Sequence, residues 1–403
     1  MSPRMSGPMR SRAVRRGLGA AAALILPLAL LSACAPEESA NPESTETSPS
    51  AEETHHEATE AEPGEPLRDG ETRVTVAMEE PYTPSAPTGK GTDDYRCFLL
   101  DPGLNKDSYL TGTHVLPGDP TVVHHVILFK VAPEDVAAAK QLDAEAEGAG
   151  WTCFGGTGLQ SPADQLNDAN WIAAWAPGSD ERVTKDGYGT KLAKGTQVIM
   201  QVHYNLLQGP KPDVSATQLR LASTKQPMTE LSTMLLPAPV EMPCREEYAD
   251  GPLCSRQETM LELMGRFGAD SGTADALHLL CGDDWTPGER SSCVRDINEP
   301  MTIHGVAGHM HLLGREIKVV VNPGTPKERT ILDIPVWDFD DQGMKTIDPV
   351  KVAPGDQVEV TCRHVQWLRD KLPAFEGQPD RYVVWGDGTT DEMCLGMLSV
   401  SKS

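Results

Sequence analysis

The residues best suited to chemistry are five histidines in short apolar stretches and one methionine near the end of the chain. They are His124 and His125 in TVVHHVILFK, His203 in IMQVHYN, His309 and His311 in AGHMHLLGREI, and Met393 in DEMC. Side chains of a β-strand alternate between its two faces, so His309 and His311 project from the same face. This spacing allows two imidazoles to hold one metal ion.

The adjacent pair His124 and His125 lies in a stretch so apolar that we expect both faces to be buried. Strand alternation would send the two rings to opposite faces, so joint ligation requires a bend or a bulge in the strand. A structural alternative exists for each ligand. A buried histidine can bond to a backbone carbonyl, a lone strand histidine such as His203 is often structural, and Met393 can be core filler.

The combination of donor types narrows the choice of metal. Imidazole suits copper, zinc, iron and nickel, whereas a thioether favours soft Cu(I) and is a poor ligand for zinc. A mixed set of histidines and methionine therefore favours copper that cycles between two oxidation states. A zinc hydrolase with three histidines is an alternative, but it leaves Met393 without a role, and no CxxC spacing points to a cysteine-rich zinc site.

The elements that must position these residues are mostly short strands separated by turn residues. This pattern is typical of antiparallel β-sandwiches rather than of parallel α/β units. The predicted strands are 73–78, 95–100, 121–129, 196–205, 217–222, 302–312, 316–321, 357–362 and 381–385.

Residues 244–293 differ from the β pattern and predict a small helical insertion. Ser255 and Glu258 have the spacing of a capping box, and an apolar helical face follows, with Met260, Leu261, Met264 and Phe267. A second helix over 274–280 is expected, with Thr273 as its cap. The cysteines of this segment suggest Cys254–Cys281 nested inside Cys244–Cys293, with the local pairs 244–254 and 281–293 as the rival connectivity.

The N-terminus reads as an export signal. Residues 1–33 carry five arginines, no acidic residue and a short apolar run, and they end in Leu-Ser-Ala before Cys34, which looks like a bacterial lipobox. Cys34 would then carry the lipid. Residues 34–71 are acidic and rich in Ser, Thr and Pro, which predicts a disordered linker. We therefore expect an extracytoplasmic protein that only its N-terminal lipid attaches to the membrane.

Charge and cysteine content constrain partners and compartment. Without the five arginines of residues 1–33, 30 basic residues remain against 59 acidic ones, a net charge of −29. Such a chain is not expected to bind nucleic acid or anionic membranes electrostatically. Nine cysteines minus Cys34 leave eight, which predicts four disulfides in an oxidising compartment.

Four motifs together resemble a known family. HHVILF, QVHYN, HMHLLGREI and DEMC, in this order, are similar to the copper type II, ascorbate-dependent monooxygenases, which include peptidylglycine α-hydroxylating monooxygenase and dopamine β-monooxygenase. The resemblance covers about residues 90–403 outside the 244–293 insertion. It implies two jelly-roll-like β-sandwich domains, for which we take residues 72–225 and 226–403.

The resemblance also implies a division of labour among the ligands. His124, His125 and His203 would bind an electron-transfer copper, and His309, His311 and Met393 an oxygen-activating copper. Disulfides Cys97–Cys153 and Cys362–Cys394 match family positions. The implied reaction is hydroxylation of a substrate C–H bond by O₂, with two coppers per chain and an external reductant, which is ascorbate in the family.

The substrate is expected to differ from that of the peptide-hydroxylating members. Those members have an Arg two residues before the HxH pair, an Asn two residues after the Met and a Tyr four residues after the Met. In this chain the three positions are occupied by Ala307, Leu395 and Met397, respectively. An apolar trio cannot pair with a carboxylate, so we expect a small apolar or neutral substrate. The alternative from another class is a non-catalytic copper-binding or copper-storing lipoprotein on the same scaffold.

Overall fold

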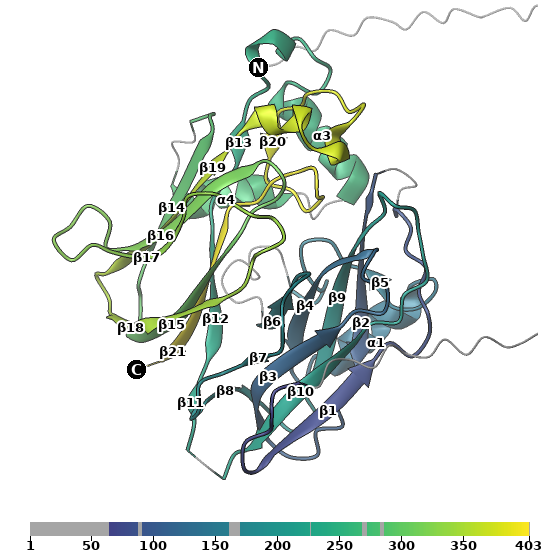
Figure 1. Cartoon of the computed structure of the whole chain (residues 1–403), viewed down its shortest axis with the longest axis vertical. Helices are drawn as coiled ribbons and strands as arrows, with labels where there is room; N and C mark the ends of the chain where they lie inside the picture. The colour runs from purple at the N-terminus through teal and green to yellow at the C-terminus, as the bar shows by residue number, and fades with distance from the viewer. Residues whose placement is uncertain are drawn as a thin grey trace, which may run out of the picture. The chain divides into compact units, whose positions relative to one another are not determined.

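The fold of the described residues consists mainly of antiparallel sheets, with few helices (Figure 1). The computed structural model describes residues 64–87, 91–160, 170–225, 227–267, 272–282 and 286–402. The predicted signal peptide 1–33, the lipidation site Cys34 and most of the linker lie outside the described residues.

The first half of the described chain forms two sheets. One has the order β1-β10-β3-β8-β11, with β7 also paired to β3, and the other has the order β5-β2-β9-β4-β6. The bounds are β1 Glu71–Ala77, β2 Asp93–Leu100, β3 Ser108–Leu116, β4 Val123–Val131, β5 Trp151–Thr152, β6 Trp171–Trp175, β7 Arg182–Val183, β8 Tyr188–Leu192, β9 Gln197–Asn205, β10 Ala216–Ser223 and β11 Thr229–Glu230.

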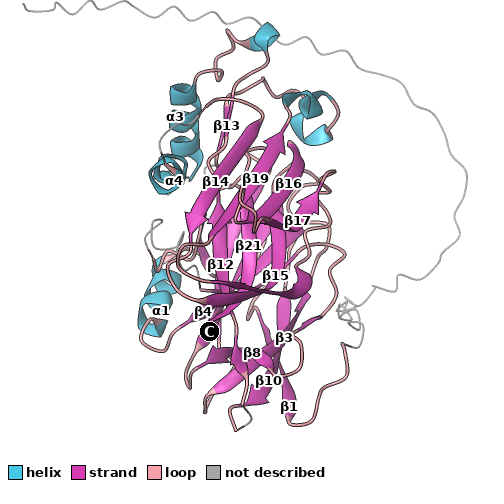
Figure 2. Ribbon diagram, turned by 90° about the vertical axis from the view of Figure 1, so that its left-hand side faces the viewer, coloured by secondary structure: helices cyan, strands magenta, loops and turns pink. Residues whose placement is uncertain are grey.

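The second half forms two further four-stranded sheets and a short two-stranded one (Figure 2). Their orders are β12-β21-β15-β18, β14-β19-β16-β17 and β13-β20. The bounds are β12 Ser232–Pro237, β13 Glu241–Met242, β14 Arg290–Asp296, β15 Met301–His309, β16 Gly314–Val321, β17 Arg329–Ile334, β18 Lys345–Val352, β19 Gln357–His364, β20 Val383–Val384 and β21 Leu395–Lys402.

Both halves have the same strand order, which is that of a jelly roll. Without the two-residue strands, each half of the described chain has eight strands. In both halves the first, eighth, third and sixth strands form one sheet, and the second, seventh, fourth and fifth form the other. The predicted all-β, jelly-roll-like fold class is thus confirmed. The chain passes from the first pair of sheets to the second between β11 and β12.

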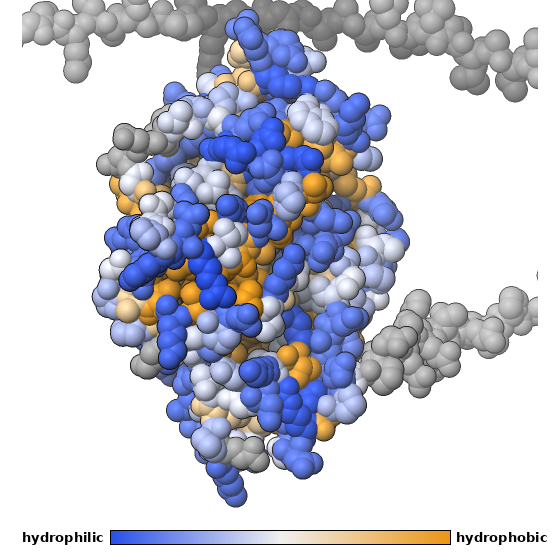
Figure 3. Space-filling model, turned by 60° about the vertical axis from the view of Figure 1, so that its left-hand side comes forward, coloured by the Kyte–Doolittle hydropathy of each residue, from blue (hydrophilic) through white to orange (hydrophobic). Residues whose placement is uncertain are grey.

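Each sandwich encloses its own apolar core. Leu128, Met200 and Leu219 are fully buried in the first, and Ile303 and Val360 in the second. These side chains come from facing sheets, as expected where the inner faces of two sheets pack together. The surface is largely hydrophilic, although apolar side chains gather near the middle of the face in Figure 3. Among the described residues, no helix has the length and apolarity needed to cross a membrane.

The α-helices of the described residues are α1 (Val136–Glu145), which was not predicted, and α3 (Arg256–Phe267) and α4 (Thr273–Cys281) in the predicted insertion. Three short 3-10 helices, η1 (Glu246–Tyr248), η3 (Gln366–Asp370) and η4 (Pro373–Phe375), lie in the second half. The Ser255 hydroxyl accepts a hydrogen bond from the Glu258 backbone N–H at 3.2 Å, which places this cap where the sequence predicted it. The predicted buried face of α3 was partly wrong. Thr259 and Leu263 are the buried residues, whereas Leu261 and Met264, both counted in that face, are exposed. Thr273 lies inside α4 rather than capping it, because Gly272 occupies the N-cap position.

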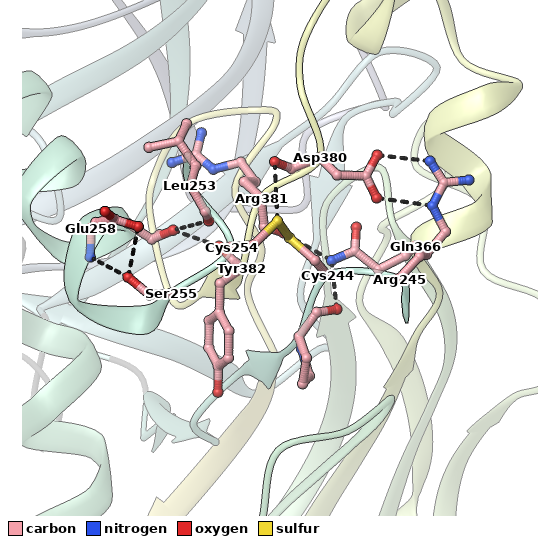
Figure 4. Close-up of a disulfide and its surroundings, with 12 residues drawn as sticks. Cys244, Arg245, Leu253, Cys254, Ser255, Glu258, Gln366, Asp380, Arg381 and Tyr382 are labelled. Atoms are coloured by element: carbon pink, nitrogen blue, oxygen red, sulfur yellow. Dashed lines mark hydrogen bonds and ion pairs between the residues drawn. A yellow bond between two sulfur atoms is a disulfide. The ribbon is translucent and has the colours of Figure 1, made fainter. Parts of the chain in front are cut away.

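The nested disulfide connectivity was wrong and the local one holds: the insertion contains Cys244–Cys254 and Cys281–Cys293. The two ends of the helical pair lie against different backbone segments. The Cys254 sulfur is 3.6 Å from the Asp380 carbonyl oxygen, and the Cys281 sulfur is 3.6 Å from that of Pro237 (Figure 4 shows the first bridge). Cys293 lies in β14, so the predicted insertion also included the start of a core strand.

Two further predictions concern the remaining disulfides and the end of the predicted linker. The disulfides Cys97–Cys153 and Cys362–Cys394 are present as the family resemblance implied. The last residues of the predicted disordered linker are ordered by the fold, however, because the buried Arg220 donates a hydrogen bond to the Pro66 carbonyl oxygen at 2.7 Å. Glu71, the last residue of that segment, begins β1.

Candidate metal centres

A bulge in β4 brings the first three histidines together. The register between β4 and β9 shifts between Val123 and His125, which cancels the alternation that would have separated the two adjacent rings. The Nδ1 atom of His124 lies 3.2 Å from that of His125 and 3.3 Å from that of His203. The Nδ1 atoms of His125 and His203 are 3.2 Å apart. Three imidazole nitrogens therefore converge on one point.

Hydrogen bonding alone cannot satisfy this triangle. Each Nδ1 carries either a proton or a lone pair, and three atoms of two kinds cannot form three complementary donor–acceptor pairs. The centre of a triangle with these sides is about 1.9 Å from each nitrogen, close to a metal–nitrogen bond of about 2.0 Å. The buried Nε2 atom of His124 has no hydrogen-bond partner among the described residues. The three residues fit a metal ion held through Nδ1.

A buried carboxylate fixes the orientation of His203. Its Nε2 atom donates to Asp93 Oδ1 at 2.8 Å, which leaves Nδ1 unprotonated and free to bind a metal. Thr389, from the loop before Met393, also donates to Asp93 through its hydroxyl and at 3.2 Å through its backbone N–H. Burial would raise the pKa of Asp93, but the hydrogen bonds from His203 and Thr389 outweigh it and hold this pKa well below its ordinary value.

The other rings of this group are held neutral. Burial, reinforced by the nearby His203, lowers the pKa of both His124 and His125 well below the ordinary histidine value. A metal ligand must be an unprotonated imidazole, so protons compete weakly with a metal here.

The second pair lies where β15 ends: His309 is the last residue of the strand and His311 lies two residues beyond it, so the predicted strand 302–312 was too long at this end. The two ring centres are 5.0 Å apart and their planes are nearly perpendicular. His311 Nδ1 donates to the Asp391 carbonyl oxygen at 3.2 Å, and His309 Nδ1 donates to the side-chain oxygen of Gln342. Both rings therefore use Nδ1 for a structural bond and keep Nε2 for a ligand. Burial lowers the pKa of His309 to about 3 and also lowers that of His311.

Met393 is fixed next to this pair by the strand register. His309 is the register partner of Leu395 in the antiparallel β15–β21 ladder, so two further steps would place Met393 opposite His311. Met393 and His309 line the same cavity.

Interactions on both sides of Met393 hold it in place. On one side the Glu392 carboxylate accepts hydrogen bonds from the backbone N–H groups of His311, at 3.0 Å, and of Leu313. On the other side Cys394 is bridged to Cys362.

The two groups of histidines adjoin each other. The ring centres of His125 and His309 are 6.0 Å apart. Phe339 stacks on His124 with 4.6 Å between ring centres and lies 6.4 Å from the ring centre of His311. All five histidines named by the sequence therefore form one cluster with two ligand groups.

A cavity of about 230 Å³ opens beside this cluster. Its lining includes His125, His309 and Met393, and its apolar wall includes aromatic and aliphatic side chains of both sandwiches: Trp171, Trp175, Leu235, Ala307, Leu395 and Met397. The last three are the positions where the resembled family has polar substrate ligands, and the structure places them together in the wall. The cavity is on the small side for ligand sites, which typically measure about 300–1,000 Å³.

The residues that orient the rings were not predicted. They are Asp93, Gln342, Thr389, Asp391 and Glu392. The adjacent acids in DEMC were the one available signal. Another histidine of β15, His304, bonds through its Nε2 atom to the Ser401 hydroxyl at 2.8 Å, and its ring packs on Tyr188.

Comparisons with known proteins neither identify the chain nor bear on its chemistry. No family model matches it, and no curated protein matches it in sequence. Among solved structures, it has 9% identity to the major capsid protein P2 of bacteriophage PM2, over 82% of this chain and 97% of that one, with a TM-score of 0.29. Procruciferin, an 11S globulin from Brassica napus, has 11% identity over 82% and 84% of the two chains, with a TM-score of 0.17. Likenesses this weak carry no argument, and the jelly-roll assignment comes from the strand order.

Proposed function

We propose that the protein is a copper-dependent monooxygenase of the copper type II kind, which hydroxylates a C–H bond of a small, largely apolar substrate. The observation that carries the proposal is the convergence of the three Nδ1 atoms of His124, His125 and His203, next to a second histidine pair whose Nε2 atoms form no hydrogen bond with the described residues. Both groups adjoin one largely apolar cavity.

The ligand sets would divide as the donor chemistry suggests. Nδ1 of His124, His125 and His203 would hold one copper, and Nε2 of His309 and His311 with the Met393 sulfur would hold the other. When bound, copper supplies the electrons and the oxygen activation that C–H hydroxylation by O₂ requires. The electron donor is external, and the low pKa values of His124, His125, His309 and His311 keep these four rings unprotonated at neutral pH.

The role of the remaining residues is positioning and exclusion of water. Asp93 and Gln342 fix which ring nitrogen faces the metal, since each accepts the proton of the other nitrogen. Ala307, Leu395 and Met397 form an apolar wall beside His309, so the part of a substrate that reacts there is expected to be apolar.

The test is copper analysis combined with oxygen consumption and a search for products that have gained one oxygen atom. We expect two coppers per chain and turnover with a chemical reductant. Met393→Ile should abolish turnover and retain one copper. Met234→Ile, a partly buried methionine of β12 outside the cavity lining, should leave both unchanged. Two coppers without oxygen consumption would support a copper carrier instead, and full activity of Met393→Ile would remove the second site.

A further inference from the structure

Arg182 in β7 is the one lysine or arginine among the described residues that line the cavity. No described acidic group forms an ion pair with it, and the neighbouring Glu181 is already bound to Arg73 at 2.8 Å. Its side chain is partly buried, and burial lowers the pKa of Arg182. A partly buried cation normally has an anionic partner, so one that lacks such a partner among the described residues is available to a ligand.

Arg182 lies among polar residues at one end of the cavity. β7 and β8 both pair with the same edge of β3, where Arg182 faces Thr113 and Thr190 faces Leu110. The Leu231 backbone N–H donates to the Gly189 carbonyl oxygen at 2.9 Å, which brings the start of β12 beside β8. The lining at this end is hydroxyl-rich, with Thr184, Thr190, Ser232, Thr233 and Ser399.

The histidines and Met393 lie at the opposite end. Alternate residues of β21 and the position just before it face the cavity, in the order Met393, Leu395, Met397 and Ser399. Leu395 is the register partner of His309, whereas Ser399 pairs with Thr233 and Gly305. Ser399 is four residues after Leu395 in the strand, which corresponds to about 14 Å. The wall thus changes from metal ligands through apolar side chains to hydroxyl groups near a cation.

We propose that the substrate is an elongated apolar molecule with one carboxylate, which Arg182 binds while the distal carbon chain reaches the histidine cluster. The inference rests on the proposed function for the reaction itself, but the binding mode stands on the cavity alone. Guanidinium offers a bidentate fork to a carboxylate, and the surrounding hydroxyls can donate further bonds. The apolar trio at Ala307, Leu395 and Met397 excludes the carboxylate from the reacting end.

The charge pattern of the cavity argues for this orientation. Asp387 is the acidic residue of the described lining, and it lies at the histidine end, where the Tyr95 hydroxyl donates to its carbonyl oxygen at 2.6 Å. An anionic group would be attracted to Arg182 at the other end of the cavity, whereas an amine would be repelled from Arg182. Probes of opposite charge therefore distinguish the two orientations.

The experiment measures binding of three probes of equal length to the full, copper-free protein: decanoate, 1-decanol and decylamine. Fluorescence of the cavity tryptophans and calorimetry report the affinities. We expect decanoate to bind at least tenfold more tightly than the other two. Arg182→Gln should lose that advantage and bind decanoate about as weakly as decanol. Lys185→Gln removes the same charge from an exposed position three residues away and should bind decanoate like the wild type.

Stability measurements separate a binding role from a structural one. An unpaired cation in a partly apolar wall opposes folding, so Arg182→Gln should have an equal or higher melting temperature. A clear drop in melting temperature would assign Arg182 a structural role and overturn the proposal. Unchanged decanoate affinity in Arg182→Gln, or tighter binding of decylamine, would overturn it as well. The binding experiment measures no turnover, so its result is independent of the oxygen-consumption test of the proposed function. If the protein bound decanoate through Arg182 but consumed no oxygen, the monooxygenase proposal would be refuted and the carboxylate site would remain.

Discussion

The hydrogen bond between Asp93 and His203 gives the sharpest test of the first metal centre. Asp93→Asn keeps an oxygen that can accept the Nε2 proton at the observed 2.8 Å but removes the negative charge. A charge-assisted hydrogen bond is roughly twice as strong as a neutral one and contributes about 1.5–3 kcal/mol. The substitution should therefore cost about 1–1.5 kcal/mol of metal binding at this centre, which is about a tenfold loss of affinity.

The assay is competition for Cu(I) with a chromophoric chelator, which resolves two binding steps in the wild type. Asp93→Asn should weaken one step and leave the other unchanged, and Asp93→Ala should weaken the same step by up to about 100-fold. The control is Asp94→Asn. Asp94 is equally buried on the opposite face of β2, but its carboxylate accepts from the Tyr82 hydroxyl at 2.6 Å and the Ser85 N–H at 2.9 Å.

Two results would refute the reasoning. If Asp93→Asn bound Cu(I) with the wild-type affinity at both steps, His203 would not be a ligand that Asp93 orients. If Asp94→Asn weakened Cu(I) binding as much as Asp93→Asn does, the loss of any buried carboxylate in β2, rather than loss of ligand orientation, would explain the effect. Urea unfolding of the metal-free variants checks that both are folded.

Three further predictions concern the second centre and the pH range. The metal-free protein should lose stability as pH falls from 6.5 towards 3, because His309 takes up its proton only on unfolding in this range. One such proton lowers the free energy of unfolding by about 1.4 kcal/mol per pH unit. Urea unfolding at pH 7 and pH 5 should show this loss of stability. Replacing Cys362 and Cys394 by serine should lower the free energy of unfolding by about 4 kcal/mol, because the disulfide closes a loop with a separation of 32 residues. Of the two coppers, the one at the second centre should then be released first. Gln342→Leu should weaken the second Cu(I) step about tenfold, whereas Gln342→Glu, which keeps an acceptor for His309, should retain it; equal affinities in both variants would exclude this contact as a determinant.

The ligand cluster was predictable where its geometry follows from strand periodicity alone. The spacing of His309 and His311 predicts a shared face because strand side chains repeat every second residue, whereas Met393 was assigned to the same site from the family resemblance and not from periodicity. His124 and His125 required a bulge that no residue in TVVHHVILFK specifies. Its position depends on how β4 pairs with β9, which is a property of two strands more than 60 residues apart along the chain.

The missed strands show the same dependence on tertiary context. β18, KTIDPVKV, buries only two of its residues and carries a proline, so its sequence lacks the apolar alternation of a strand. It forms because β15 offers a free edge. β14 was hidden inside the predicted helical insertion, since its burial pattern is equally weak. The helical pair is real, but its cysteines bond locally because Cys254 and Cys281 lie against different backbone segments.

The loop before β21 contributes to both ligand groups, and this has a consequence for how they would work together. Thr389 bonds to the carboxylate that orients His203, and four residues later Met393 lines the same cavity as His309. Between them, Asp391 accepts the proton of His311. A displacement of this loop would therefore change the orientation of His203 and the position of Met393 at the same time. The ring centres of His125 and His309 are 6.0 Å apart, so a substitution that displaces the loop as a whole should affect both metal-binding steps together, whereas one that removes a single ligand should affect one step.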